Sequence, residues 1–118
     1  MKFKSLIAAI GIIALLLSSK AYAITPYVQG YRLYIRYIKH IPGAGIKAPQ
    51  LLKKLNVITE EQFQNLFKNN AQELIQKTEA FNPKAAKAIQ KIVKEGKLKY
   101  LKAFLYGIFE GKIPPGWM

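Results

Sequence analysis

The sequence predicts an all-α protein: a small bundle of five or six short helices that follows an N-terminal signal segment. Three observations support this fold class. Apolar residues recur every three or four positions through most of the chain. Helix caps and breakers, mainly Asn, Pro and Gly, separate these runs. No two runs look like strands that could pair with each other. Because only a few residues connect the runs, consecutive helices should pack as neighbours.

Residues 1–23 have the three parts of a secretory signal. Two lysines precede an apolar run over residues 6–17, and an Ala-x-Ala pattern ends at Ala23. The apolar run is shorter than the roughly 20 residues that a membrane-spanning helix needs. We therefore expect cleavage after Ala23, a periplasmic or secreted protein, and one helical domain over residues 24–118. Without cleavage, the segment would anchor the protein in the inner membrane.

The first helix of this domain is predicted over residues 27–40. Its tyrosines and isoleucines recur at helical spacing, while Arg32 and Arg36 fall on another side. Tyr and Ile also favour strands, but no second strand candidate exists to pair with this segment. A helix is therefore favoured, and Pro42 and Gly43 end it.

Two further helices are predicted from their caps. One covers residues 47–55, with Pro49 in its first turn, where a missing N–H costs nothing, and Asn56 as a left-handed stop. The next starts at a capping box in which Thr59 and Gln62 satisfy each other's backbone N–H groups. The apolar residues expected to face inward from these two helices are Leu51, Leu52, Leu55, Phe63, Leu66 and Phe67.

Three more helices complete the prediction. The fourth covers residues 71–80, after a break at Asn69 and Asn70. The fifth starts at the cap Asn82, followed by proline, and runs to residue 95, and the sixth covers residues 98–109. Glycines stop the last two helices. The residues expected inside are Leu74, Ile75, Ala85, Ala86, Ala88, Ile89, Ile92, Val93, Leu101, Phe104, Leu105 and Ile108.

Charge and missing residue types narrow the function. The chain has 19 Lys and Arg against 6 acidic residues, a net charge of +13, and the loss of three lysines with residues 1–23 leaves +10. Such an excess favours a polyanion or an anionic membrane surface as partner. Residues 24–118 contain no Cys, Ser or Asp and a single histidine, His40. Nucleophile–base pairs and clusters of metal ligands are therefore missing, and we predict a non-enzymatic protein without cofactor, metal or small-molecule substrate.

A glycine-rich turn lies between two amphipathic, lysine-bearing segments. Its residues are Ile41, Pro42, Gly43, Ala44, Gly45, Lys47, Ala48, Leu51 and Leu52. This pattern resembles the helix-hairpin-helix motif of DNA-binding proteins, and the similarity covers residues 38–67, about a third of residues 24–118. The resemblance implies that hairpin N–H groups bind DNA phosphates without reading the bases. The matching positions are Gly43, Ala44, Gly45 and Lys47; Ala44 stands where a bulkier apolar residue is usual in the family.

The sequence thus predicts non-specific binding of a polyanion, with DNA as the leading candidate. Lys53 and Lys54 would add positive charge beside the hairpin, and Arg32 and Arg36 would extend the positive strip. The tyrosines of the first helix could stack on exposed bases, or they could simply pack in the core.

A second interpretation is a cell-envelope structural or interaction protein that binds a membrane surface or a protein partner. The predicted helix over residues 98–109 is apolar on more than one face, and lysines flank it. This combination suits an anionic lipid surface. The same pattern also fits the central core helix of a small bundle, so the burial of this helix would distinguish the two.

Overall fold

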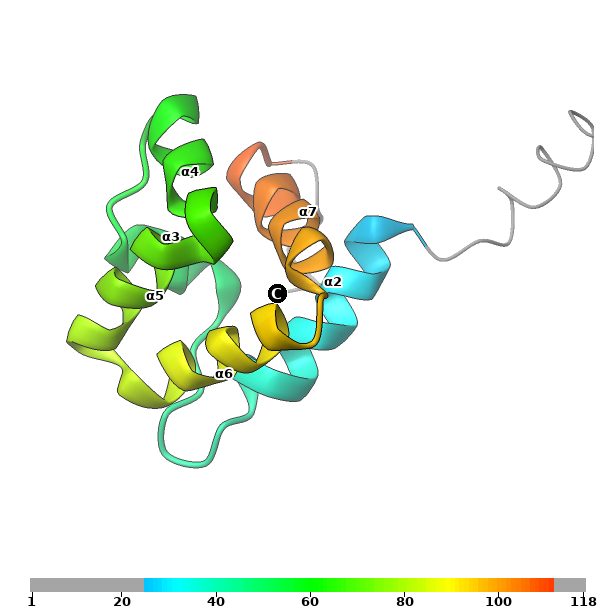
Figure 1. The fold of residues 1–118 in the computed structure, drawn as a ribbon, viewed down its shortest axis with the longest axis vertical. Coiled ribbons are helices and arrows are strands. Elements are labelled where there is room, and N and C mark those ends of the chain that lie inside the picture. Colours follow the sequence, from blue (N-terminus) through cyan, green and yellow to red (C-terminus); the bar gives the residue numbers. More distant parts are fainter. Residues whose placement is uncertain (1–24, 112–118) are drawn as a thin grey trace, which may run out of the picture.

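The computed structural model describes residues 25–111, and within them the protein is entirely helical (Figure 1). This confirms the all-α prediction, whereas the predicted signal over residues 1–23 and the chain after residue 111 lie outside the described residues. A short π-helix, η1, continues directly from the first helix. The elements are α2 (Pro26–Tyr34), η1 (Ile35–Lys39), α3 (Ala48–Lys54), α4 (Glu60–Leu66), α5 (Lys68–Phe81), α6 (Pro83–Lys94) and α7 (Leu98–Phe109).

The expected caps are present at the helix starts. The Gln62 N–H donates to Oγ1 of Thr59 at 3.1 Å, and the Thr59 N–H donates to Oε1 of Gln62 at 3.0 Å. The predicted capping box of α4 is therefore confirmed. At α6, the Ala85 N–H donates to Oδ1 of Asn82 at 3.1 Å. The expected stops are also left-handed, with φ of 60° at Asn56 and 74° and 72° at two glycines, Gly96 and Gly111.

The first helix is continuous, as predicted, but its last turn is wider than an α-helix. Residues Ile35–Lys39 are π-helical, and the helix ends at Lys39, ahead of Pro42. Wide turns of this kind occur mostly as single insertions in otherwise regular helices. The periodicity of the apolar residues predicted the helix but not this local change of pitch.

The start of α5 is left-handed at three successive residues. Asn69, Asn70 and Ala71 have φ of 52°, 58° and 61°, which confirms the predicted break at the two asparagines. Asparagine tolerates this conformation, whereas alanine pays about 1–2 kcal/mol for it. Ala71 is fully buried, so packing against the core holds it in this conformation.

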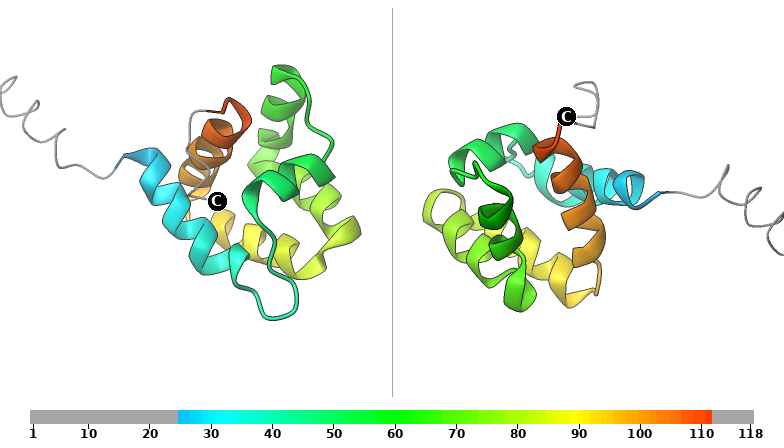
Figure 2. Two further views of the ribbon diagram at one scale, coloured as in Figure 1. Left: turned by 180° about the vertical axis from the view of Figure 1, so that it is seen from behind. Right: turned by 90° about the horizontal axis from the view of Figure 1, so that it is seen from above.

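The helices surround a single core (Figures 1 and 2). α2 and α7 lie side by side and make the most extensive helix contact in the described structure, while α5 packs on α6 and α6 packs on η1. α2 and α7 approach each other closely at Gly30. A Cβ there would overlap the backbone carbonyl of Tyr100 and the side chain of Phe104.

The core confirms most of the predicted inward residues. Leu51, Phe63, Leu74 and Ile89 are fully buried, and Phe104 packs between the helices with its ring centroid 5.5 Å from that of Tyr34. On α7, three apolar residues are buried: Leu101, Phe104 and Leu105. Four predicted inward residues are only half-buried: Ile75, Ala88, Val93 and Ile108.

Aromatic side chains pack α4 against α7. The ring of Phe63 lies 5.1 Å from that of Tyr106 and 5.3 Å from that of Phe109, measured between centroids. Oη of Tyr106 also donates to Oε1 of Glu60 at 2.8 Å. The carboxylates of Glu110 and Glu60 raise the pKa of the Tyr106 phenol above its ordinary value. The phenol therefore remains a donor throughout the neutral range.

Thr78 on α5 is a buried polar residue, and replacing its hydroxyl by a methyl group should not destabilise the protein. Its side chain is fully buried, and within residues 25–111 its hydroxyl has no hydrogen-bond partner. An unpaired buried hydroxyl costs about 1–3 kcal/mol. We expect Thr78→Val to match or exceed the wild-type free energy of unfolding, by up to about 1 kcal/mol, in urea denaturation. A loss of that size instead would mean that the hydroxyl has a partner in solution.

Candidate nucleic-acid interface

The glycine-rich hairpin connects η1 to α3 and begins with a tight turn. The Ala44 N–H donates to the Ile41 carbonyl at 3.0 Å, which closes a four-residue turn with Pro42 and Gly43 at its centre. Gly43 has φ of 73°. Proline followed by a residue with positive φ is the arrangement of a type II turn. The turn thus requires a residue that tolerates a positive φ at position 43, whatever the loop binds.

The second glycine has a different structural role. A Cβ on Gly45 would overlap the backbone carbonyl of Lys39, so only glycine lets the loop return this closely to the end of η1. The next residue is anchored to α2, because Oη of Tyr34 donates to the Ile46 carbonyl at 2.7 Å. Tyr34 is 1% exposed, and this burial raises the pKa of its phenol. The anchor therefore keeps its proton at any physiological pH.

A second anchor comes from the far side of the hairpin. Nδ2 of Asn82 donates to the Ala44 carbonyl at 2.8 Å, while Oδ1 of the same side chain caps α6. One amide group thus starts a helix and holds a loop that lies 38 residues earlier in the chain. Together, Tyr34 and Asn82 fix the hairpin from two directions.

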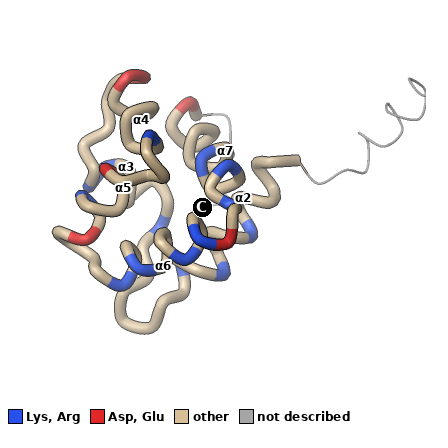
Figure 3. The backbone as a smooth tube through the Cα atoms, viewed as in Figure 1, with Lys and Arg blue, Asp and Glu red and all other residues tan. Residues whose placement is uncertain are grey.

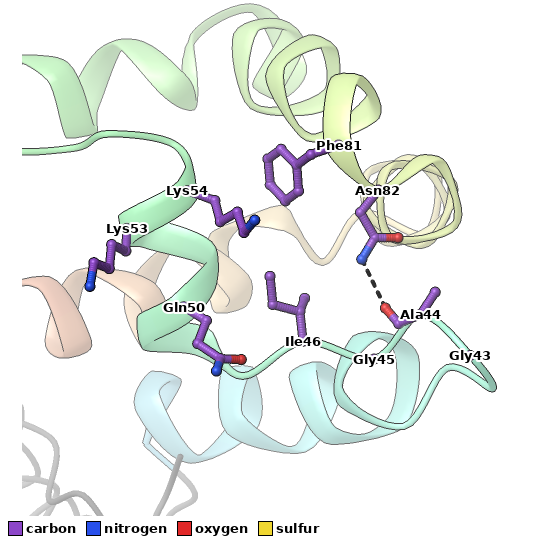
Figure 4. A pocket seen from close by; sticks show the side chains of 9 residues that line it. All are labelled: Gly43, Ala44, Gly45, Ile46, Gln50, Lys53, Lys54, Phe81 and Asn82. Atoms are coloured by element: carbon purple, nitrogen blue, oxygen red, sulfur yellow. Dashed lines mark hydrogen bonds between the residues drawn. The ribbon is translucent and has the colours of Figure 1, made fainter.

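The anchored hairpin borders an open hollow of about 720 Å³ (Figure 4). Lys54 extends across this hollow, and its Nζ lies 5.9 Å from the ring centroid of Phe81. Lys53 extends away on the outer side of α3. The lining contains cationic, amide and apolar groups but no carboxylate: Gly43, Ala44, Gly45, Ile46, Gln50, Lys53, Lys54, Phe81 and Asn82.

The backbone N–H groups of the hairpin are not equally available. Gly43 and Gly45 are exposed, and within residues 25–111 neither N–H has a hydrogen-bond partner. The Ala44 N–H is used inside the turn, and the Lys47 N–H donates to Oε1 of Gln50 at 3.3 Å. Of the four positions that match the helix-hairpin-helix pattern, the two glycines therefore offer free backbone N–H groups, whereas the backbone N–H groups of Ala44 and Lys47 are already used.

The structure separates seven of the eight predicted site residues into two places, and Lys47 lines neither of them. Five of them line the hollow: Gly43, Ala44, Gly45, Lys53 and Lys54. Arg32 and Arg36 instead line a smaller depression of about 150 Å³ together with Lys97. The tyrosines that were candidates for base stacking are partly used in the core, where Tyr31 and Tyr34 both contact the ring of Phe104. Tyr34 in particular has no exposed face for a base.

Sequence reasoning missed Phe81 and Asn82 as members of this site. The Asn-Pro pair identified Asn82 as a helix cap, but nothing local indicated that the same amide would reach the hairpin. Phe81 stands at the end of α5, and its place beside Lys54 depends on how α5 and α3 pack. The spacing of residues along the sequence does not predict a contact between segments this far apart.

Comparison with known proteins finds no match for this sequence. No protein-family model matches the sequence, and no curated protein or solved structure matches it either. Among residues 25–111, no three His or carboxylate side chains gather as metal ligands. In the same part of the chain, no helix is both long and apolar enough to cross a bilayer. A functional assignment therefore depends on the geometry of the hairpin and on the charge around it.

Proposed function

We propose that this protein binds DNA non-specifically, with the hairpin holding phosphate oxygens of the backbone. The observation that carries the proposal is the pair of exposed, unpartnered N–H groups at Gly43 and Gly45, on a loop that Tyr34 and Asn82 hold in place. The signal-like pattern of residues 1–23 supports a further part of the proposal, that the protein acts in the periplasm or in the medium.

The chemistry of the loop suits a phosphate. Glycines carry no side chain that would keep a phosphate oxygen from the main chain. A loop that is already anchored loses little conformational entropy when it binds. Lys54 lies beside the loop and supplies positive charge without a neighbouring carboxylate in the hollow. Contacts to phosphate carry no sequence information, so binding should be independent of sequence.

The number of phosphates that the protein neutralises sets the expected salt dependence. Each neutralised phosphate contributes about −0.9 to the slope of log K against log salt concentration. Four such contacts would lower the affinity about 150-fold between roughly 50 and 200 mM salt. A weaker dependence would mean that fewer cationic groups touch the backbone.

A matched pair of substitutions at Gly43 tests the role of the hairpin. Asparagine and aspartate have the same shape and both tolerate a positive φ, and a Cβ at this position meets no atom within 4 Å. Gly43→Asp should weaken binding to an arbitrary duplex at least about tenfold more than Gly43→Asn, because only aspartate repels phosphate. A tenfold change corresponds to about 1.4 kcal/mol. Fluorescence anisotropy at low salt measures the affinities, and thermal melting confirms that both variants fold.

Two results would overturn the proposal in different ways. Equal affinities for the two variants would show that phosphate does not approach the turn. A wild-type protein that binds no duplex at low salt would remove DNA as the ligand altogether.

The membrane alternative has less support in the described residues. It required an exposed apolar face on α7, but Leu101, Phe104 and Leu105 are buried against α2 and the core. Within residues 25–111, the one large apolar side chain that is strongly exposed is Ile58, at 72%. A single residue does not make an apolar patch, so DNA binding is the function that the geometry favours.

A further inference from the structure

The outer face of α6 carries four lysines in one line. Lys84, Lys87, Lys91 and Lys94, here called the lysine stripe, follow the alternating three- and four-residue spacing of a single helix face. All four are exposed, and α6 contains no acidic residue. The opposite face is buried through Ala85, Ala86, Ile89 and Ile92. Figure 3 shows the basic positions following one another along this helix.

The stripe begins at the hairpin. A second open hollow, of about 390 Å³, is lined on one side by Gly43 and Ala44 and on the other by Pro83 and Lys84. The first lysine of the stripe therefore lies next to the turn whose glycine N–H groups are free. A ligand that touches the hairpin and continues along α6 crosses no carboxylate on that helix.

The other end of α6 lies near the predicted arginines, because Lys97, three residues after α6, lines the same depression as Arg32 and Arg36. Nζ of Lys91 lies 5.4 Å from the ring centroid of Tyr37 on η1, and η1 packs on α6. Arg36, also on η1, lines the depression that contains Arg32 and Lys97. The hairpin hollow and the depression that contains Arg32 and Arg36 thus lie at opposite ends of α6.

One carboxylate interrupts this surface. Glu95 follows α6 directly, where Oη of Tyr37 donates to its Oε1 at 2.8 Å and Nζ of Lys97 lies 3.9 Å from the same oxygen. Both contacts offset its charge locally. Repulsion of a bound phosphate by Glu95 is therefore weaker than that of a free carboxylate.

Building on the proposed function, we infer that the phosphate backbone of a DNA duplex lies along the lysine stripe, from the hairpin to the Arg32 and Arg36 end. The stripe extends over about 15 Å at 1.5 Å per residue, which is too long for a single small anion and suits an extended, rigid polyanion. Lysines bind phosphate as mobile point charges without fixed geometry. They therefore add affinity and salt dependence without sequence preference.

A charge-matched pair of double variants tests the stripe. Lys87→Gln with Lys94→Gln removes two stripe charges. Lys68→Gln with Lys102→Gln removes two charges beside Phe67, and neither of these lysines lies on α6 or lines the hairpin hollows. With an arbitrary duplex of about 20 base pairs, the stripe variant should bind at least about tenfold more weakly at low salt. Its slope of log K against log salt should also become shallower by about 1.8, at 0.9 for each lost contact. The control should change affinity less than about threefold.

The outcomes separate this inference from the proposed function. If the stripe variant binds DNA as well as the control does, the inference is overturned, while the Gly43 pair still decides the role of the hairpin. If the wild type binds no DNA, the proposed function and the inference both fall. Vesicles containing phosphatidylglycerol provide a further probe. Stripe-dependent binding to these vesicles without DNA binding would assign the stripe to an anionic membrane and overturn the DNA inference.

Discussion

Gly30→Ala should destabilise the protein by about 3 kcal/mol. Alanine in a helix interior normally stabilises a protein by about 0.5–1 kcal/mol relative to glycine. At this position, however, the added Cβ would overlap the carbonyl of Tyr100 and the side chain of Phe104. The overlapping carbonyl belongs to the backbone of α7 and has no rotamer with which to move away. Over-packing of a core typically costs about 1–3 kcal/mol, occasionally more.

Urea denaturation of the Gly30→Ala variant measures this cost, and the sign of the change is the test. A matched substitution is Gln29→Ala, one position earlier on the same helix, which should change the free energy of unfolding by less than about 1 kcal/mol. If Gly30→Ala is as stable as the wild type, or more stable, α2 and α7 do not approach as closely as the structure shows.

Asn82→Ala should have the second largest effect, a loss of about 2–3 kcal/mol. The alanine removes the cap of α6, worth about 1 kcal/mol. It also leaves the Ala44 carbonyl without its donor. Such a loss costs about 1–3 kcal/mol for a buried group, and the lower part of this range applies because the carbonyl is only part-buried. Because the hairpin then loses one of its two anchors, we also expect faster hydrogen exchange at the Ala44 N–H and weaker DNA binding.

Asn82→Asp separates the two roles of this side chain. A carboxylate still accepts from the Ala85 N–H and suits the positive end of α6, but it has no proton to donate to the Ala44 carbonyl. The free energy of unfolding should therefore fall less than in Asn82→Ala, while Ala44 exchange increases in both variants. Chemical denaturation and amide exchange by NMR measure these quantities. If the two variants are equally unstable, the helix cap contributes no more than the repulsion between the new carboxylate and the Ala44 carbonyl removes.

The helices could be predicted from the sequence because their start and stop chemistry is local. Thr59 with Gln62, and Asn82 with the proline after it, act within three residues of each other, and the left-handed stop at Asn56 is likewise a property of one residue. Local interactions of this kind do not depend on how the bundle packs. The π-helical turn over Ile35–Lys39 and the left-handed Ala71 do depend on it. Alanine has no preference for that conformation, so only packing explains it.

The candidate site was predictable in part for the same reason. The Pro42–Gly43 pair specifies a turn, and Lys53 and Lys54 are close to it along the chain, so the sequence placed them together. Arg32 and Arg36 are close in sequence too, but they lie on α2 and η1 and line a different depression. The lysine stripe was not predicted, although its spacing is present in residues 84–94 of the sequence. Its position beside the hairpin could not be predicted, because that depends on the packing of α5, α6 and η1.

The anchors of the hairpin have a consequence for how the protein acquires its shape. Tyr34 and the Ile46 carbonyl that it binds are 12 residues apart, whereas Asn82 and the Ala44 carbonyl are 38 residues apart. Closing the longer of these loops costs chain entropy before any contact forms. The hairpin should thus adopt its final conformation late in folding, after α6 has packed against the other helices. A peptide of residues 38–67 would contain neither anchor. The glycine-rich loop is therefore not a portable module, since its conformation is a property of the complete domain.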